Sequence, residues 1–161
     1  MDATTSDEVE TPSRTRVERR SDREIVVTRT FDAPARLVFA AWSTPELFKR
    51  WWVPKSMDME LHDCEMDVRT GGSYRLNFGQ GMDFYGRYIE VVPDALIVWT
   101  NDEDGADGSV TTVTFEEQDG RTLLVMSEVF PSAEALDAAG GAADATHETF
   151  AQLDELLAEL G

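Results

Sequence analysis

The chain has 161 residues, of which 42% are hydrophobic and 29% charged, the composition of an ordinary globular domain. Its single cysteine excludes an intramolecular disulfide and a cysteine-based zinc site. No apolar run approaches the about 20 residues of a membrane-spanning helix, and the N-terminus lacks the apolar segment of a signal peptide. These features predict a cytoplasmic protein.

Acidic side chains dominate the charge of the chain. Asp and Glu total 32 and Lys and Arg total 14, which gives a formal net charge of −18. A field of this sign repels phosphate backbones and anionic lipid surfaces, so we expect neither nucleic acid nor a membrane as a partner.

Residues 1–23 mix charges of both signs and contain Val9 and Val17 as their only aliphatic residues beyond Met1 and Ala3. Such a segment buries too little apolar surface to offset the entropy of ordering. We predict a disordered leader over 1–23 and one folded domain over 24–161.

The domain begins with a strand and two short helices. The β-branched run Glu24–Phe31 predicts the strand. Asp32, as a candidate cap, and Pro34, in an early helical position, predict a helix over 34–43. Thr44-Pro45 can open a second helix that ends near residue 52.

Between Met57 and Phe130 the apolar residues alternate with polar ones, which is typical of strands. Turns rich in Gly, Pro and Asp divide this region into predicted strands over 57–68, 73–78, 82–92, 95–101, 109–117 and 122–130. Consecutive strands joined by short turns pair antiparallel, so we expect one curved antiparallel sheet.

A short helix over 133–139 and a long amphipathic helix over 142–160 complete the predicted order. The apolar stripe of the long helix consists of Phe150, Leu153, Leu156, Leu157 and Leu160. This stripe can be buried against the concave face of the sheet, which predicts an α+β fold wrapped around the C-terminal helix. Space for a small ligand is expected between helix and sheet.

Several short motifs identify a family resemblance that covers about residues 24–160. They are Phe31-Asp-Ala-Pro34, Val38-Phe39-Ala-Ala-Trp42, Thr44-Pro45-Glu46, Trp51-Trp52, Pro54-Lys55, Gly71-Gly72, Gly86 with Val91-Val92-Pro93, Thr112-Val113-Thr114-Phe115, Gly120-Arg121-Thr122 and Phe130-Pro131-Ser132. The chain closely resembles the SRPBCC (START/Bet v 1-like) superfamily, in the branch similar to the C-terminal domain of activators of the heat-shock-protein-90 ATPase. The resemblance implies a helix-grip fold with an internal hydrophobic cavity that binds a small apolar molecule.

One departure from the family concerns the last helix, which usually opens with an acidic residue followed by Gly-Trp. Here the corresponding stretch is Ala145-Thr-His-Glu-Thr-Phe150. We therefore expect Phe150 or His147 to supply the aromatic group that faces the cavity.

Aromatic residues gather on the elements predicted to face the cavity or its rim. The expected ligand-binding residues are Trp42, Trp51, Trp52, Phe78, Tyr85, Arg87, Trp99, Met126, His147 and Phe150. Adjacent tryptophans in one helical turn cannot both point inward, so one of Trp51 and Trp52 is expected at the cavity edge. An inward Arg87, or Arg75 or Asn77, would orient a ligand through its polar groups.

The residues offer little for catalysis or for cofactors. No nucleotide-binding motif or metal-ligand spacing is present, and neither a metal nor a cofactor is expected. His62 is interpreted as an edge-strand histidine near a buried Cys64, and His147 as a half-exposed residue in the first turn of the last helix. In a cavity mouth, however, His147 could act as a general base.

Three functions follow from these observations. The first is non-catalytic binding of a small hydrophobic or aromatic molecule, flavonoid-like or polyketide-like, by a monomer or weak homodimer. The second is a cyclase, dehydratase or hydrolase that uses His147 or an acidic residue in the same cavity. The third is a co-chaperone-like interaction module, although the short leader cannot replace the N-terminal domain that such activators carry.

Overall fold

The computed structural model describes residues 15–53, 55–57, 61–79, 83–101, 109–138 and 142–160. Its strands are β2 (Arg16–Arg19), β3 (Glu24–Phe31), β4 (Asp63–Met66), β5 (Ser73–Asn77), β6 (Asp83–Val92), β7 (Leu96–Thr100), β8 (Val110–Gln118) and β9 (Arg121–Val129). Its helices are α2 (Ala35–Ser43), α3 (Pro45–Trp51), the 3₁₀ turn η1 (Lys55–Met57), α4 (Ala133–Ala138) and α5 (Ala142–Leu160). The strands form one eight-stranded antiparallel sheet in the order β2-β3-β9-β8-β7-β6-β5-β4.

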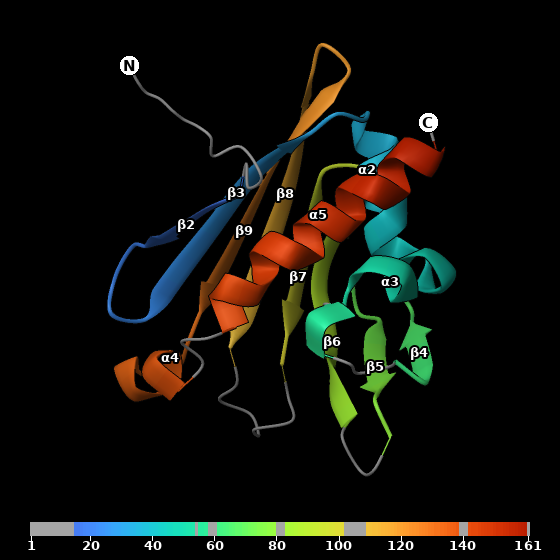
Figure 1. Ribbon diagram of the computed structural model, residues 1–161. Helices are drawn as coiled ribbons and strands as arrows, with labels where there is room; N and C mark the ends of the chain where they lie inside the picture. The colour runs from blue at the N-terminus through green and yellow to red at the C-terminus, as the bar shows by residue number, and fades with distance from the viewer. Residues whose placement is uncertain are drawn as a thin grey trace, which may run out of the picture.

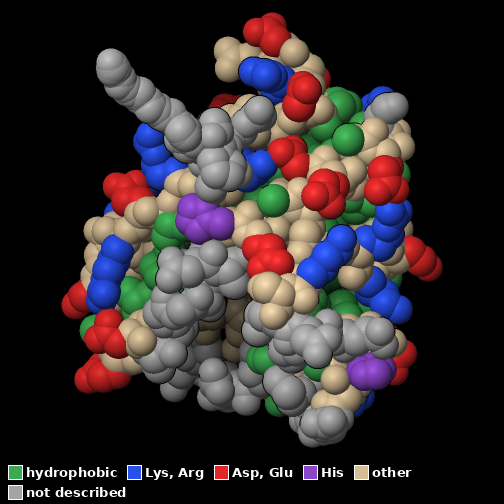
Figure 2. All heavy atoms as spheres, viewed as in Figure 1, with side chains coloured by type: hydrophobic (Ala, Val, Ile, Leu, Met, Phe, Trp, Pro, Cys, Tyr) green, Lys and Arg blue, Asp and Glu red, His purple; other side chains and the backbone are tan. Residues whose placement is uncertain are grey.

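Helix α5 lies diagonally across one face of the sheet, and α2 and α3 lie beside its C-terminal half (Figure 1). Phe150, Leu153, Leu156 and Leu157 are buried beneath the helix, and the Phe150 ring meets the Phe31 ring edge-on at 5.5 Å. The predicted α+β helix-grip fold is therefore confirmed. Figure 2 shows Asp and Glu side chains spread over the face that carries α5, with Lys and Arg among them.

Helix α2 begins differently from the prediction. Pro34, rather than Asp32, is its N-cap, and it makes no side-chain capping bond. The Glu117 carboxylate of β8 instead accepts a hydrogen bond of 2.9 Å from the Ala35 N–H. The negative charge of this carboxylate also interacts favourably with the positive end of the helix dipole. The cap thus comes from a residue about 80 positions away in the sequence.

The predicted disorder of the leader is wrong for residues 15–23; residues 1–14 lie outside the described part of the chain. Strand β2 pairs with β3, with Val17 opposite Val27, and Val17 packs against the hydrophobic core. The buried Thr15 hydroxyl accepts a bond of 2.9 Å from the Arg29 guanidinium, which also pairs with Asp154 of α5 at 2.6 Å. Backbone pairing with β3, together with the contacts of Val17 and Thr15, accounts for the order of this segment.

The predicted strand over 57–68 is shorter in the structure. Met57 ends the 3₁₀ turn η1, residues 58–60 lie outside the described part of the chain, and Asp63–Met66 pair with β5 as the edge strand β4. His62 is exposed just before this strand, and Cys64 is half-buried within it. The remaining predicted elements agree with the structure within one or two residues.

The lack of a side chain at Gly86 allows the ring of Tyr74 to lie across β6. Gly86 pairs with Tyr74 of β5, and the Tyr74 hydroxyl donates a bond of 2.7 Å to the Thr100 carbonyl on β7. A Cβ at position 86 would lie 1.9 Å from the Thr100 carbonyl oxygen and 2.9 Å from the Tyr74 ring. Glycine is therefore required here by the close approach of the backbone.

We expect Gly86→Ala to lower the free energy of unfolding by about 3 kcal/mol, because the added methyl overlaps backbone atoms that cannot move independently. Gly120→Ala serves as the control, because a Cβ there meets no atom within 4 Å although its φ of +81° is unfavourable for alanine. That variant should lose only about 1 kcal/mol. Equal losses in urea titrations of the two variants would contradict the packing argument.

Removal of residues 1–19 should lower the melting temperature relative to removal of residues 1–14, because it also deletes β2 and the Thr15 partner of Arg29. A loss of about 1 kcal/mol corresponds to about 4 °C for a chain of this size. Comparison of the two truncations by calorimetry isolates residues 15–19. Identical melting temperatures would show that the pairing of β2 contributes nothing to stability.

Candidate functional site

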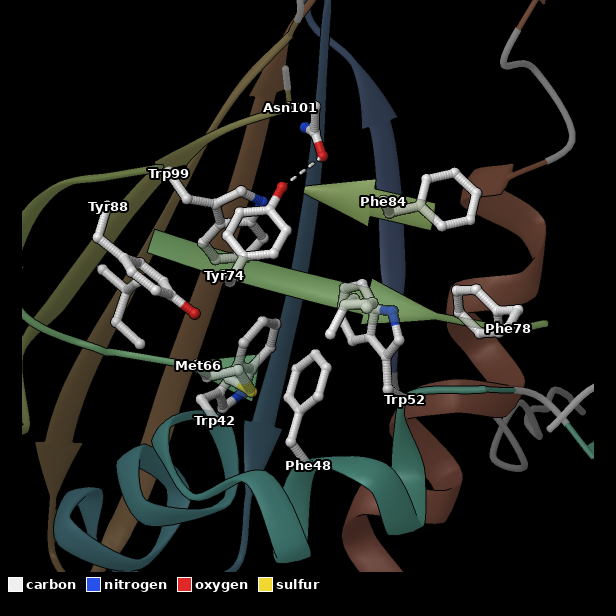
Figure 3. Close-up of a pocket in the computed structure, with 12 residues that line it drawn as sticks. Trp42, Phe48, Trp52, Met66, Tyr74, Phe78, Phe84, Tyr88, Trp99 and Asn101 are labelled. Carbon is white, nitrogen blue, oxygen red and sulfur yellow. Dashed lines mark hydrogen bonds between the residues drawn. The ribbon is translucent and has the colours of Figure 1, made fainter. Parts of the chain in front are cut away.

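A cavity of about 210 Å³ lies between the helices α2 and α3 and the strands β4 to β7 (Figure 3). The residues that line it are Trp42, Phe48, Trp52, Met66, Tyr74, Leu76, Phe78, Phe84, Tyr88, Ile97, Trp99 and Asn101. Most of these side chains are aromatic, and Asn101 is the one amide among them. The walls therefore suit an apolar molecule, with few groups to orient it.

Trp42 of α2 forms the centre of the helical wall. Its ring lies 4.8 Å from that of Trp51, and 5.8 Å from each of the rings of Trp52 and Trp99. Phe48 of α3 stacks on Trp52 at 4.7 Å. All four tryptophans of the chain thus belong to one cluster, which packs on the core with one side and borders the cavity with the other.

The strand wall follows the alternation of side chains along β5, β6 and β7. Tyr74 points inward from β5, Tyr88 from β6 and Trp99 from β7 (Figure 3). Leu76, two residues after Tyr74 in β5, also lines the cavity. Phe78 and Phe84 meet edge-on at 5.4 Å and lie together at one end of the cavity. Phe84 is 37% exposed, so this end of the cavity borders the solvent.

A chain of hydrogen bonds fixes the polar end of the cavity. The Tyr74 hydroxyl, besides its bond to Thr100, lies 3.0 Å from the Asn101 side-chain oxygen. The Asn101 amide donates to the Ser109 hydroxyl at 2.8 Å, which donates to the Glu128 carboxylate at 2.8 Å. The Asn101 amide is therefore engaged within the protein, and its oxygen lies against the Tyr74 hydroxyl.

The titratable groups at the cavity are phenols. Among the described residues that line it, Tyr74 and Tyr88 are the ones with a titratable side chain. Burial raises the pKa of Tyr88 well above its ordinary value, so its hydroxyl stays protonated at neutral pH. Burial also raises the pKa of Cys64, outside the cavity, to about 11, which keeps that thiol protonated and a poor nucleophile.

Four of the residues predicted from sequence line the cavity: Trp42, Trp52, Phe78 and Trp99. Trp51 and Phe150 do not, because both are buried in the core behind Trp42. The Trp51 indole N–H donates to the Ala41 carbonyl at 3.0 Å. Of the two adjacent tryptophans, Trp52 is thus the one at the cavity.

Tyr85 and Arg87 are exposed and lie on the opposite face of the sheet from the cavity, together with Arg75. Because neighbouring residues of a strand point to opposite faces, the inward position of Tyr88 in β6 places Tyr85 and Arg87 outside. The expectation that they face the cavity is therefore wrong. Arg75 pairs with Asp83 at 2.7 Å on this outer face.

Met126 and His147 also lie outside the residues that line the cavity. Met126 of β9 is partly buried against the hydrophobic core, and His147 is half-buried in the first half of α5. Neither places a polar or titratable atom at the cavity wall. His147 is therefore not positioned as a general base for a molecule held there.

Eight lining residues were not among the expected ligand-binding residues: Phe48, Met66, Tyr74, Leu76, Phe84, Tyr88, Ile97 and Asn101. Leu76 shares the inward face of β5 with Tyr74, so alternation alone could have placed it once the orientation of Tyr74 was fixed. Asn101 follows the last residue of β7, and no local pattern distinguishes it from a turn residue.

Three side chains on α5 attach this helix to the C-terminal end of α3 and to the segment that follows it. The buried Gln152 donates to the carbonyls of Trp51 and Val53 at 3.0 and 2.9 Å, and accepts from the Lys55 N–H at 2.9 Å. Glu148 accepts two hydrogen bonds from Ser56, which lower the pKa of its carboxyl group. Glu159 pairs with Arg50 at 2.6 Å. These contacts fix the position of α3, and with it the cavity wall formed by Phe48 and Trp52.

An antiparallel sheet wrapped around a long C-terminal helix, with a cavity beneath two short helices, defines a protein of the helix-grip class. The family model described as "Activator of Hsp90 ATPase homolog 1-like protein" matches residues 32–158. The chain belongs to this family, in agreement with the resemblance found in the sequence.

Solved structures show the same fold. A protein from Rhodobacter sphaeroides is 24% identical with a TM-score of 0.79, over 91% of this chain and 99% of that one. One from Mycobacterium smegmatis is 24% identical with a TM-score of 0.75, over 91% and 99%. One from Staphylococcus epidermidis is 27% identical with a TM-score of 0.69, over 90% and 94%. No curated protein matches the chain.

Two further features concern the described residues only. None of the helices in this part of the chain has the length and apolar character needed to cross a membrane. No three His, Cys, Asp or Glu side chains of these residues come together in an arrangement that could hold a metal ion.

We expect Gln152→Glu to lower the free energy of unfolding by about 1–3 kcal/mol, because a carboxylate cannot donate to the two carbonyls and leaves them unpaired. Gln118→Glu makes the same chemical change at an exposed position and should change it by less than about 0.5 kcal/mol. Urea denaturation of both variants at neutral pH tests the expectation. Equal stabilities would show that Gln152 does not hold α5 to α3.

Proposed function

We propose that the protein binds one small hydrophobic or aromatic molecule in this cavity, without catalysis. The observation that carries the proposal is the cavity itself, whose described lining is apolar and aromatic except for a few hydroxyl, indole and amide groups. Replacement of water by an apolar ligand in such a cavity lowers the free energy of the system. The aromatic walls favour flat rings, which make edge and stacking contacts with them.

The volume of the cavity limits the size of the ligand. An apolar cavity of about 150 Å³ holds benzene, and sites for drug-sized molecules usually measure about 300–1,000 Å³. At about 210 Å³, the cavity suits a molecule of two fused rings rather than a three-ring flavonoid. We therefore narrow the ligand class from flavonoid-like or polyketide-like compounds to compact bicyclic ones.

The groups around the cavity favour binding over the enzyme alternative. General acid–base catalysis needs a group whose pKa lies near the working pH and that reaches the substrate. His147 does not line the cavity, and no carboxylate is among the described residues that do. Tyr88 does line it, but burial keeps its hydroxyl protonated.

Binding can be tested with a panel of two-ring compounds, namely tetralin, naphthalene and 1-tetralone. We expect saturable binding of one molecule with micromolar affinity, quenching of tryptophan fluorescence, and thermal stabilisation. A ligand at a hundred times its dissociation constant adds about 2.7 kcal/mol of stability. Isothermal titration calorimetry measures the stoichiometry and affinity directly.

Two aromatic-to-alanine variants distinguish the cavity from the outer face of the sheet. Phe78→Ala removes a ring from the cavity wall and should weaken binding by about tenfold, equal to about 1.4 kcal/mol. Tyr85→Ala removes a ring from the opposite face and should leave the affinity unchanged. Absence of saturable binding by every compound, or equal effects of the two variants, would contradict the proposal.

A further inference from the structure

We infer that the ligand carries a neutral hydrogen-bond acceptor, such as a ketone, quinone or lactone oxygen, which accepts from the Trp42 indole N–H and the Tyr88 hydroxyl. The inference rests on the proposed function and specifies the chemical class of ligand for the same cavity. It follows from two polar groups of the cavity wall, the Trp42 indole N–H and the Tyr88 hydroxyl, for which the described residues supply no hydrogen-bond partner.

The Trp42 indole nitrogen is a buried donor without a partner. The side chain is 2% exposed, and its N–H makes no hydrogen bond to any of the described residues. Buried polar groups in proteins are nearly always hydrogen-bonded, so each exception needs an explanation. Trp51 in the same cluster shows the usual arrangement, since its indole N–H donates to the Ala41 carbonyl at 3.0 Å.

The Tyr88 hydroxyl also has no hydrogen-bond partner among the described residues. The residue is 5% exposed, its ring points from β6 into the cavity, and its hydroxyl makes no hydrogen bond within the described part of the chain (Figure 3). Its neighbour Tyr74, whose ring lies 5.6 Å away, has its hydroxyl placed between the Thr100 carbonyl and the Asn101 side chain. Of the two phenols, only Tyr88 is thus available to a ligand.

The unpartnered groups determine the chemistry of the ligand. An indole N–H can only donate, whereas a tyrosine hydroxyl can donate or accept. Asn101 is held within the protein, because its amide donates to Ser109 and its side-chain oxygen lies 3.0 Å from the Tyr74 hydroxyl. A ligand atom that satisfies Trp42 must therefore supply a lone pair, and a carbonyl oxygen has two.

The charge of the wall excludes an anionic acceptor. A carboxylate in an apolar cavity needs a cation as its partner, and no Lys, Arg or His is among the described residues that line this one. The arginines of the strands β5 and β6, Arg75 and Arg87, lie on the outer face of the sheet. A neutral carbonyl on a compact ring system meets both conditions.

Calorimetry with 1-tetralone and tetralin tests the inference, because the two compounds differ in one carbonyl group and little in shape. We expect the wild-type protein to bind 1-tetralone about tenfold more tightly, equal to about 1.4 kcal/mol. Indole, a bicyclic donor without an acceptor, should bind no more tightly than tetralin. Tyr88→Phe should reduce the preference for 1-tetralone to about threefold, mainly by weakening the binding of 1-tetralone.

Tyr74→Phe is the matched control, since it removes a hydroxyl that is already bonded within the protein. It should lower the melting temperature and reduce the preference for 1-tetralone less than Tyr88→Phe does. The Trp42 donor is followed without substitution in a ¹H–¹⁵N spectrum of the indole groups. Its proton should move downfield on binding of 1-tetralone and not on binding of tetralin, with the Trp51 indole as the internal reference.

The outcomes separate this inference from the proposed function. Equal affinities for 1-tetralone and tetralin would overturn the inference, with water satisfying the two donors, and leave the proposed function intact. A preference lost in Tyr74→Phe and kept in Tyr88→Phe would overturn the assignment to Tyr88. No binding of any compound would overturn the proposed function and this inference with it. If Tyr88→Phe fails to fold, the wild-type affinity ratio and the Trp42 resonance still decide.

Discussion

The packing of Trp42 is the constraint on which both the core and the cavity depend. Its ring contacts aromatic rings from α3, β7, β8 and α5, so one side chain joins both short helices, the sheet and the C-terminal helix. Close packing on one side holds the ring in place, and its other side borders the cavity. The same residue thus gives the hydrophobic core its rigidity and the candidate site its shape.

The attachment of α5 to the C-terminal end of α3 and the segment after it completes this arrangement. Glu148, Gln152 and Glu159 lie four and seven positions apart, and all three bond to residues 50–56. A spacing of this kind keeps them on one side of the helix. The helix therefore does more than cover the sheet, because it also holds the helical wall of the cavity against the strands.

Sequence patterns located nearly every element, because alternation and helical periodicity depend on local burial alone. They could not decide which face of β6 points inward, because both faces carry large side chains: Phe84 and Tyr88 on one, Tyr85 and Arg87 on the other. The pairing of Tyr74 with Gly86 settles the orientation, and that register is a property of two strands. Long-range contacts were equally inaccessible: the cap by Glu117, the bonds of Gln152, and the pairing of β2, whose own residues are mostly charged.

The single tryptophan cluster has a consequence for how this protein is observed. The indoles lie at ring separations of 4.8–5.8 Å through Trp42, close enough for excitation energy to pass between them. Intrinsic emission therefore comes from one region, at the helical end of the sheet, instead of averaging over the molecule. A fluorescence melting curve follows the loosening of that region and contains no signal from the β2–β3 edge, where an optically silent part of the sheet could open first.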